Sequence, residues 1–195
     1  MVKNLDGSVN SWAVFHKAAG NTKYFELDVT NAVATGTNRW QDTSPDTVNF
    51  TTGNSDTVNN SSYNYICYAW SEVQGYSKFG SYTGNGGSGS SGSFCYLGFK
   101  PAFVMIKKTS GVSSWILFDN KRASTSNIPE GTTGVPSYLE PNTTGTEQGD
   151  NPIFFFSNGF QTQDTIVNAS GGAYIYIAFA EAPLVNSNGV PNNAR

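Results

Sequence analysis

The chain has 195 residues and a net charge of -3 at pH 7, and only 13% of its residues are charged, about half the usual share of roughly 25%. The acidic balance argues against a nucleic-acid partner, because binding to phosphates requires a basic patch. No apolar run reaches the roughly 20 residues that span a bilayer, and residues 1–4 lack the apolar stretch of a signal peptide. We therefore expect no membrane insertion.

The composition favours short β-strands joined by hydrogen-bonded turns. Aromatic residues make up 14% of the chain, glycines number 21, and Asn, Ser and Thr fill most polar positions. In chain order, apolar runs next to turn residues predict strands at residues 11–16, 103–108, 114–119 and 153–156. The Gly- and Ser-rich residues 84–93 between strand candidates predict either a linker or a long mobile loop.

Two parts of the chain resemble each other. Residues 1–4 followed by Trp12 correspond to residues 105–108 followed by Trp115, and the strand at 65–72 corresponds to that at 174–181. The sequence therefore predicts two copies of a unit of roughly 110 residues.

The expected division follows from this correspondence. Residues 1–75 form an incomplete first β repeat, residues 76–185 a complete second repeat, and residues 186–195 a C-terminal tail. The paired strands at 65–72 and 174–181 are apolar on both faces, which predicts central strands. Each should be covered by a second sheet on one side and by another module or subunit on the other.

The expected fold class is all-β. We predict antiparallel β-sandwich units of jelly-roll or concanavalin-like type in tandem, with under about a tenth of the residues in helix and no helix of three turns.

Several motifs in fixed order resemble a known family. It is a tandem-repeat domain of unknown function that occurs in tail-fibre and other large virion proteins of bacteriophages, particularly marine phages and cyanophages. The likeness covers nearly the whole chain, and residues 191–195 resemble the carboxyl ends of such proteins. The motifs that carry it are residues 75–86, 98–107, Trp115 with residues 119–122, residues 157–160, and residues 174–181.

The resemblance implies a virion location in the phage tail fibre, after synthesis in the host bacterial cytoplasm. It also implies a homotrimer, with other tail proteins and a host cell-surface glycan or protein as partners. The family offers no catalytic residues to carry over, and we expect a non-catalytic chain with no cofactor. Two alternatives stay open, a polysaccharide-degrading tailspike domain and a head fibre or capsid decoration protein.

Candidate receptor-binding residues lie in two places. A polar cluster directly follows the strand at 114–119, and it reads either as a binding surface or as a solvated strand exit with an ion pair. The longest candidate loop, residues 123–150, is expected to lack secondary structure, and such loops often bind ligands. The alternative for this loop is a surface excursion or a subunit contact. The candidates are Asp119, Asn120, Lys121, Arg122, Tyr138, Asn142 and Thr143.

Other reactive side chains favour structural roles. His16 is the only histidine and is expected at the surface or at a strand end. Glu72 and Glu181 recur at equivalent positions and are expected to cap or pair with a neighbouring strand rather than to form a glycosidase pair. Cys67 and Cys95 lie in apolar runs, which predicts buried free thiols. Residues 42–46 and 54–56 match no defined calcium loop, so no metal site is predicted. Most tryptophans and tyrosines should be core residues rather than sugar-stacking platforms.

Overall fold

The computed structural model describes residues 1–6, 10–122, 133–135, 137–149 and 152–181. These residues form three antiparallel sheets of five, four and four strands. They contain two four-residue α-helices and one three-residue 3-10 helix, so the prediction of a mostly antiparallel β fold with little helix is confirmed. No helix in the described ranges is long and apolar enough to cross a membrane.

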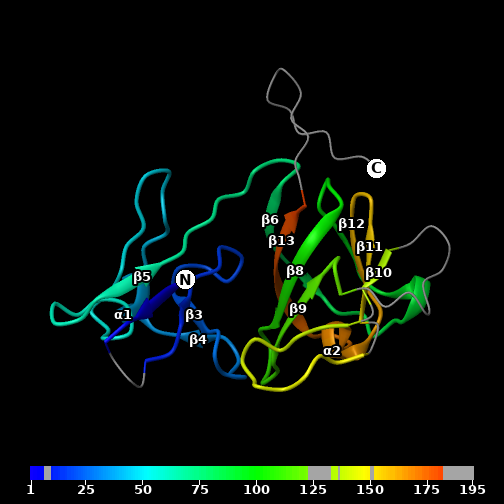
Figure 1. Ribbon diagram of the computed structural model, residues 1–195. Coiled ribbons are helices and arrows are strands. Elements are labelled where there is room, and N and C mark those ends of the chain that lie inside the picture. The colour runs from blue at the N-terminus through cyan, green and yellow to red at the C-terminus, as the bar shows by residue number, and fades with distance from the viewer. Residues whose placement is uncertain (7–9, 123–132, 136, 150–151, 182–195) are drawn as a thin grey trace.

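The N-terminal sheet has the strand order β4-β3-β2-β1-β5 and occupies the left half of Figure 1. Its strands are short, and the connection between β4 and β5 carries helix α1. The elements are β1 (Val2–Asn4), β2 (Ala13–Val14), β3 (Lys23–Glu26), β4 (Ala34–Thr35), α1 (Thr37–Trp40) and β5 (Tyr65–Cys67).

The other two sheets pack together in the right half of Figure 1, with the orders β6-β13-β8-β9 and β10-β11-β12-β7. Their longest strands, β8 and β13, have eight residues each. The elements are β6 (Ser77–Thr83), η1 (Gly89–Ser91), β7 (Phe94–Tyr96), β8 (Pro101–Lys108), β9 (Trp115–Asp119), β10 (Thr133–Val135), β11 (Ile153–Phe156), β12 (Gly159–Thr162), α2 (Thr165–Asn168) and β13 (Ala173–Ala180).

Strand β13 is the centre of the molecule. It pairs with β6 on one side and β8 on the other, and its alternate side chains enter two different cores. Tyr174 and Tyr176 pack against the sheet that contains β12, while Ile175 and Ile177 pack against the N-terminal sheet. The prediction of a central strand buried on both faces is confirmed here, and the covering module belongs to the same chain.

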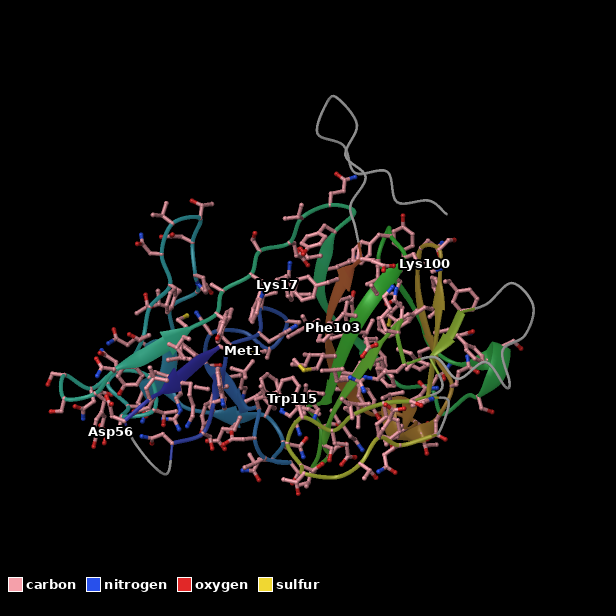
Figure 2. The ribbon with its side chains drawn as sticks, viewed as in Figure 1. Met1, Lys17, Asp56, Lys100, Phe103 and Trp115 are labelled. Atoms are coloured by element: carbon pink, nitrogen blue, oxygen red, sulfur yellow. The ribbon has the colours of Figure 1, made fainter. Side chains whose placement is uncertain are left out.

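The N-terminal sheet is fastened to β8 and β9 by two buried side chains. Trp115 extends from β9 toward the N-terminal sheet (Figure 2), where its indole N–H donates to Glu26 O at 2.9 Å. Lys107 on β8 is fully buried and donates from Nζ to Thr30 O at 3.0 Å and to Ser113 O. Burial lowers the pKa of Lys107 to about 8, because an ammonium loses its hydration in the core.

The prediction of a central strand that is buried on both faces is wrong for β5. This strand lies at the edge of its sheet, and Tyr68 and Trp70, just beyond it, are 45% and 48% exposed. Tyr68 stacks between Trp12 and Trp70, with ring centroids 6.1 Å apart in both pairs. Local sequence is as apolar here as in β13, but no strand of the described residues covers the outer side.

The Gly- and Ser-rich residues 84–93 are not a linker. They connect β6 to β7 within the second half of the chain, and the fully buried Asn168 side chain hydrogen-bonds to Asn85, Gly87 and Ser93. A Cβ on Gly92 would lie 1.6 Å from Thr162 O. Glycine is therefore required at this position by the close approach of β12.

Strand pairing in the two halves repeats in register. Val2 pairs with Ala13 and Cys67 in the N-terminal sheet. Ile106 pairs with Ile116 and Tyr176 in the second half. These are the residues that the sequence comparison aligns, so β2-β1-β5 and β9-β8-β13 share one arrangement.

Candidate functional site

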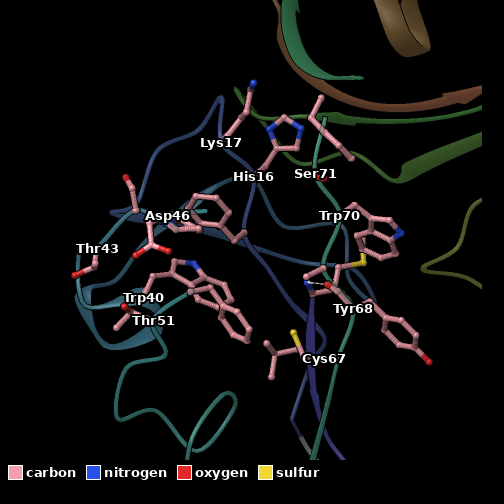
Figure 3. Close-up of a pocket in the computed structure, with 18 of the residues that line it drawn as sticks. His16, Lys17, Trp40, Thr43, Asp46, Thr51, Cys67, Tyr68, Trp70 and Ser71 are labelled. Carbon is pink, nitrogen blue, oxygen red and sulfur yellow. Dashed lines mark hydrogen bonds between the residues drawn. The ribbon is translucent and has the colours of Figure 1, made fainter. Parts of the chain in front are cut away.

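A cavity of about 430 Å³ opens beside the N-terminal sheet (Figure 3). Four stretches of the first half meet there, and β6 and β13 contribute one residue each. The lining consists of Met1, Val2, residues 15–17, Gly20, Trp40, residues 43–46, Phe50, Thr51, residues 67–72, Phe79 and Ile177.

Aromatic rings line one side of the cavity. Phe15 follows β2 and meets Trp40 of α1 edge-on, with ring centroids 5.9 Å apart. The Trp40 indole N–H donates to Lys23 O at 3.1 Å, which fixes the ring against the sheet. Phe50 lines the same cavity and is 47% exposed. Cys67 faces these rings from β5, while Tyr68 and Trp70, which also line the cavity, lie on the other side of β5 in Figure 3.

The rim near α1 is polar and carries one carboxylate. Thr43, Ser44 and Thr51 line the cavity beside Asp46. The Asp46 carboxylate accepts hydrogen bonds from the backbone N–H groups of Asn49 at 2.6 Å and Val48 at 2.7 Å. These two bonds lower the pKa of Asp46, so it is ionised at neutral pH.

Glu72 and Lys17 form an ion pair at the opposite rim. Glu72 also accepts a hydrogen bond from the Phe79 backbone N–H at 3.0 Å. Desolvation raises the pKa of Glu72, but the hydrogen bonds from Lys17 and Phe79 outweigh it and leave the pKa below its usual value. The expected pairing role of Glu72 is confirmed.

His16 is buried rather than exposed, so the surface expectation is wrong. Its Nε2 lies 3.1 Å from Tyr176 O, and its Nδ1 accepts from the Ala18 backbone N–H at 3.2 Å. One tautomer satisfies both contacts, the neutral ring with its proton on Nε2. Burial lowers the pKa of His16, and neighbouring Lys17 acts in the same direction.

The His16 environment predicts a stability that depends on pH. Because the pKa is lower in the folded state, the contribution of His16 is complete above about pH 6.5 and is lost as pH falls toward the folded pKa. We expect the free energy of unfolding to decrease between pH 6.5 and 5, measured by urea denaturation. His16→Gln should reduce this slope, because His16 is the only histidine, and leave the part that arises from the lowered pKa values of other groups. An unchanged slope in the variant would contradict the assignment.

Among the described lining residues, the cavity has no carboxylate that keeps its proton at neutral pH. Its two carboxylates both have lowered pKa values, and its imidazole uses both nitrogens within the fold. A general acid needs a raised pKa to hold its proton at neutral pH. In the described part of the chain, no three metal-ligating side chains gather in one place.

Comparison with known families gives one match. A model described as Domain of unknown function (DUF7483) matches residues 1–183. The chain belongs to the DUF7483 family. No curated protein and no solved structure shows a significant match. The family-level expectation, a domain of unknown function over nearly the whole chain, is confirmed.

The predicted polar cluster of this DUF7483 chain is an ion-paired strand exit. The Arg122 guanidinium pairs with Asp119 at 2.5 Å and with Glu147 at 3.0 Å. Lys121 and Asn120 both bind the Glu181 carboxylate. The structural reading of the cluster and the pairing role of Glu181 are confirmed, and a receptor-binding role of these residues stays a prediction.

The second group of predicted receptor-binding residues is placed differently from expectation. Tyr138 is 5% exposed and packs against Phe118 in the core, so its ring is not presented to a ligand. Asn142 Oδ1 accepts from the Trp115 backbone N–H at 2.7 Å, while Thr143 is exposed. The neighbouring residues 123–132, 136 and 150 lie outside the described residues.

The 123–150 segment also contains secondary structure, contrary to the loop expectation. Strand β10 pairs with β11, and two isolated bridges follow it, Leu117 with Leu139 and Tyr138 with Gln148. The bridge to Gln148 fixes Tyr138 where its ring packs against Phe118 in the core.

The two cysteines differ from each other. Both are free, but only Cys95 is buried, and burial raises its pKa to about 12. The buried-thiol prediction is therefore confirmed for Cys95 and wrong for Cys67, which is exposed at the cavity edge.

Proposed function

We propose that this chain is a segment of a bacteriophage tail fibre that helps to build the fibre and binds a glycan on the host surface. The finer fold assignment is jelly-roll or concanavalin-like β-sandwich units in tandem, the first of them incomplete, and the shared strand registers of β2-β1-β5 and β9-β8-β13 support the repeat. The phage setting rests on the motif resemblance described above. The cavity beside the N-terminal sheet is the proposed receptor site.

The observation that carries the glycan assignment is the composition of this cavity. A pyranose has an apolar C–H face and a rim of hydroxyl groups, and it therefore suits aromatic rings next to small polar side chains. Phe15 and Phe50 provide the rings, Trp40 is buried and packs against Phe15, and Thr43 and Thr51 also line the cavity. The ionised Asp46 is a strong acceptor for sugar hydroxyls and repels anionic groups, which favours an uncharged glycan.

A polysaccharide-degrading tailspike domain is the second candidate, because Asp46 and Glu72 line one cavity. Glycoside hydrolysis requires one protonated carboxylic acid beside one carboxylate. Both pKa values are lowered in this cavity, which favours binding without cleavage. Release of reducing ends from host capsule or lipopolysaccharide by the purified chain would support the enzyme instead.

The proposed assembly is a homotrimer, with the oligomer number taken from the resemblance. The two apolar faces of β13 no longer require another subunit, because the N-terminal sheet fills one of them. A head fibre or capsid decoration is the structural alternative. Electron microscopy of labelled virions separates the two locations, since a capsid position would exclude the tail-fibre role.

Replacing Phe50 by Ala tests the receptor site. We expect the dissociation constant for the recognised glycan to rise about fivefold, corresponding to about 1 kcal/mol of lost ring contact. Phe50 is 47% exposed, so thermal stability should change little. Binding is measured by glycan array and then by calorimetry with the best ligand.

The matched control is Phe94→Ala. Phe94 is also 47% exposed but lies on β7, and it does not line the cavity. It should leave the dissociation constant unchanged. Equal loss of affinity in both variants, or in neither, would place the glycan site elsewhere.

A further inference from the structure

The open edge of the N-terminal sheet has an unusual surface. Strand β5 ends the sheet, and every residue from Cys67 to Gln74 is exposed. Tyr68, Trp70 and Val73 are the large apolar side chains in this stretch, each at least 45% exposed. Exposed apolar edge strands pair readily with other chains, and proteins usually cover or charge them.

The backbone of this edge is set for pairing. Met1 and Tyr68 exchange two hydrogen bonds, at 2.8 and 2.9 Å. In an antiparallel ladder the residues on either side of such a pair turn their N–H and C=O groups to the opposite side. Cys67 and Ala69 therefore direct their backbone groups away from β1.

The second half of the chain shows what occupies the corresponding edge. Strand β13 repeats the register of β5, but it has β6 as a second neighbour. Tyr176 pairs with Gly80 there, and Ala178 with Lys78. The sequence alignment places Cys67 at the Tyr176 position and Ala69 at the Ala178 position.

The β13 side chains that contact β6 have aligned counterparts in and just after β5. Tyr82 of β6 stacks on Tyr174, with ring centroids 5.0 Å apart. Phe79 of β6 meets Phe179 edge-on at 5.8 Å. The aligned residues in the first half are Tyr65 and Trp70, which are again aromatic.

We propose that the edge from Tyr65 to Trp70 binds an extended strand with the β6 pattern, donated by a partner polypeptide. The chain's own β6 is already paired with β13 over seven residue pairs, so β6 itself is not free to fill this edge, and the proposed donor belongs to a partner polypeptide. The added strand continues the sheet through main-chain hydrogen bonds, and its aromatic side chains contact Tyr65 and Trp70. This is an assembly contact that shares residues 67–70 with the cavity lining, and it is tested separately from glycan binding.

A synthetic peptide that copies residues 75–84 (GYSKFGSYTG) tests the proposal with the full chain. At about 1 mM peptide, we expect the backbone amides of Cys67 and Ala69 to exchange their hydrogens about tenfold more slowly, measured by NMR. The control peptide carries Gly80→Pro, which removes the N–H that would pair with Cys67. It should give no protection.

The chain variant Ala69→Pro provides the reciprocal test. The Ala69 N–H points away from β1, so its removal leaves the ladder between β1 and β5 intact. We expect lost peptide binding with an unchanged melting temperature. Should this variant unfold, the comparison of the two peptides still decides.

Two results would overturn the proposal. One is equal behaviour of the two peptides, whether both protect or neither does. The other is protection that grows with protein concentration in the absence of peptide, because β5 would then pair with its own copy. In either case, the Phe50→Ala experiment tests the glycan site separately.

Discussion

Replacing Trp115 by Ala is expected to lower the free energy of unfolding by about 3–5 kcal/mol, the usual range for removing a buried tryptophan. Trp115 has no exposed surface and meets Phe25 of the N-terminal sheet edge-on at 5.9 Å. Its indole N–H also satisfies Glu26 O. The substitution therefore leaves a cavity and an unpaired carbonyl at the junction between the two halves. Urea denaturation followed by circular dichroism measures the loss.

Trp70→Ala is the control for this prediction, because Trp70 is 48% exposed. It should cost less than about 1 kcal/mol. Amide exchange in β3 should accelerate in Trp115→Ala and stay unchanged in Trp70→Ala. Similar losses in the two variants would mean that the junction around Trp115 contributes little to stability.

The central position of β13 could be predicted because its sequence is apolar on both faces. The same pattern in residues 65–72 led to the wrong position for β5, since the pattern reports what a strand can bury and not which elements surround it. Both faces of β13 are covered by sheets of the same chain, whereas β5 has only β1 as a neighbour within its sheet. The different burial of β5 and β13 therefore arises from their tertiary neighbours and not from their local composition.

The cavity could not be predicted from local sequence. Its rings and rim come from residues 15–17, 40–51 and 67–72, which have no shared motif and meet only in the folded sheet. The one signal available was Glu72, whose recurrence at Glu181 indicated a partner, and each has a lysine partner. The repeat aligns His16 with Asp119, which predicts a surface or strand-end position, but His16 is buried whereas Asp119 is only half-buried.

The Ser, Thr, Asn, Gly and Pro content of residues 123–150 predicts a loop, and this prediction misplaces Tyr138. Such content is compatible with isolated bridges, and the bridge to Gln148 places Tyr138 beside Phe118 in the core. An aromatic residue within a polar segment more often anchors that segment than serves as a ligand platform.

Replacing Asn168 by Ala should strongly destabilise the protein, because its buried side chain makes four hydrogen bonds. The Asn168 amide donates to Gly87 O at 2.6 Å and to Asn85 Oδ1 at 2.8 Å. Its carbonyl oxygen accepts from Asn85 N and from the Ser93 hydroxyl, at 3.1 and 3.0 Å. Alanine removes all four hydrogen bonds of a fully buried side chain, and each such bond contributes about 1 kcal/mol net. We expect a total loss of about 3 kcal/mol in the free energy of unfolding, measured by urea denaturation.

Asn59→Ala is the matched control, because Asn59 occupies the equivalent sequence position in the first repeat. Asn59 follows Val58 as Asn168 follows Val167, and both valines are buried. Asn59 itself is exposed, so its replacement should change stability by less than about 0.5 kcal/mol. The amides of residues 84–87 should exchange faster in Asn168→Ala only, since this side chain fixes the loop between β6 and β7. Equal stability of the two variants would show that the loop is held by its backbone contacts to β12 and β13 instead.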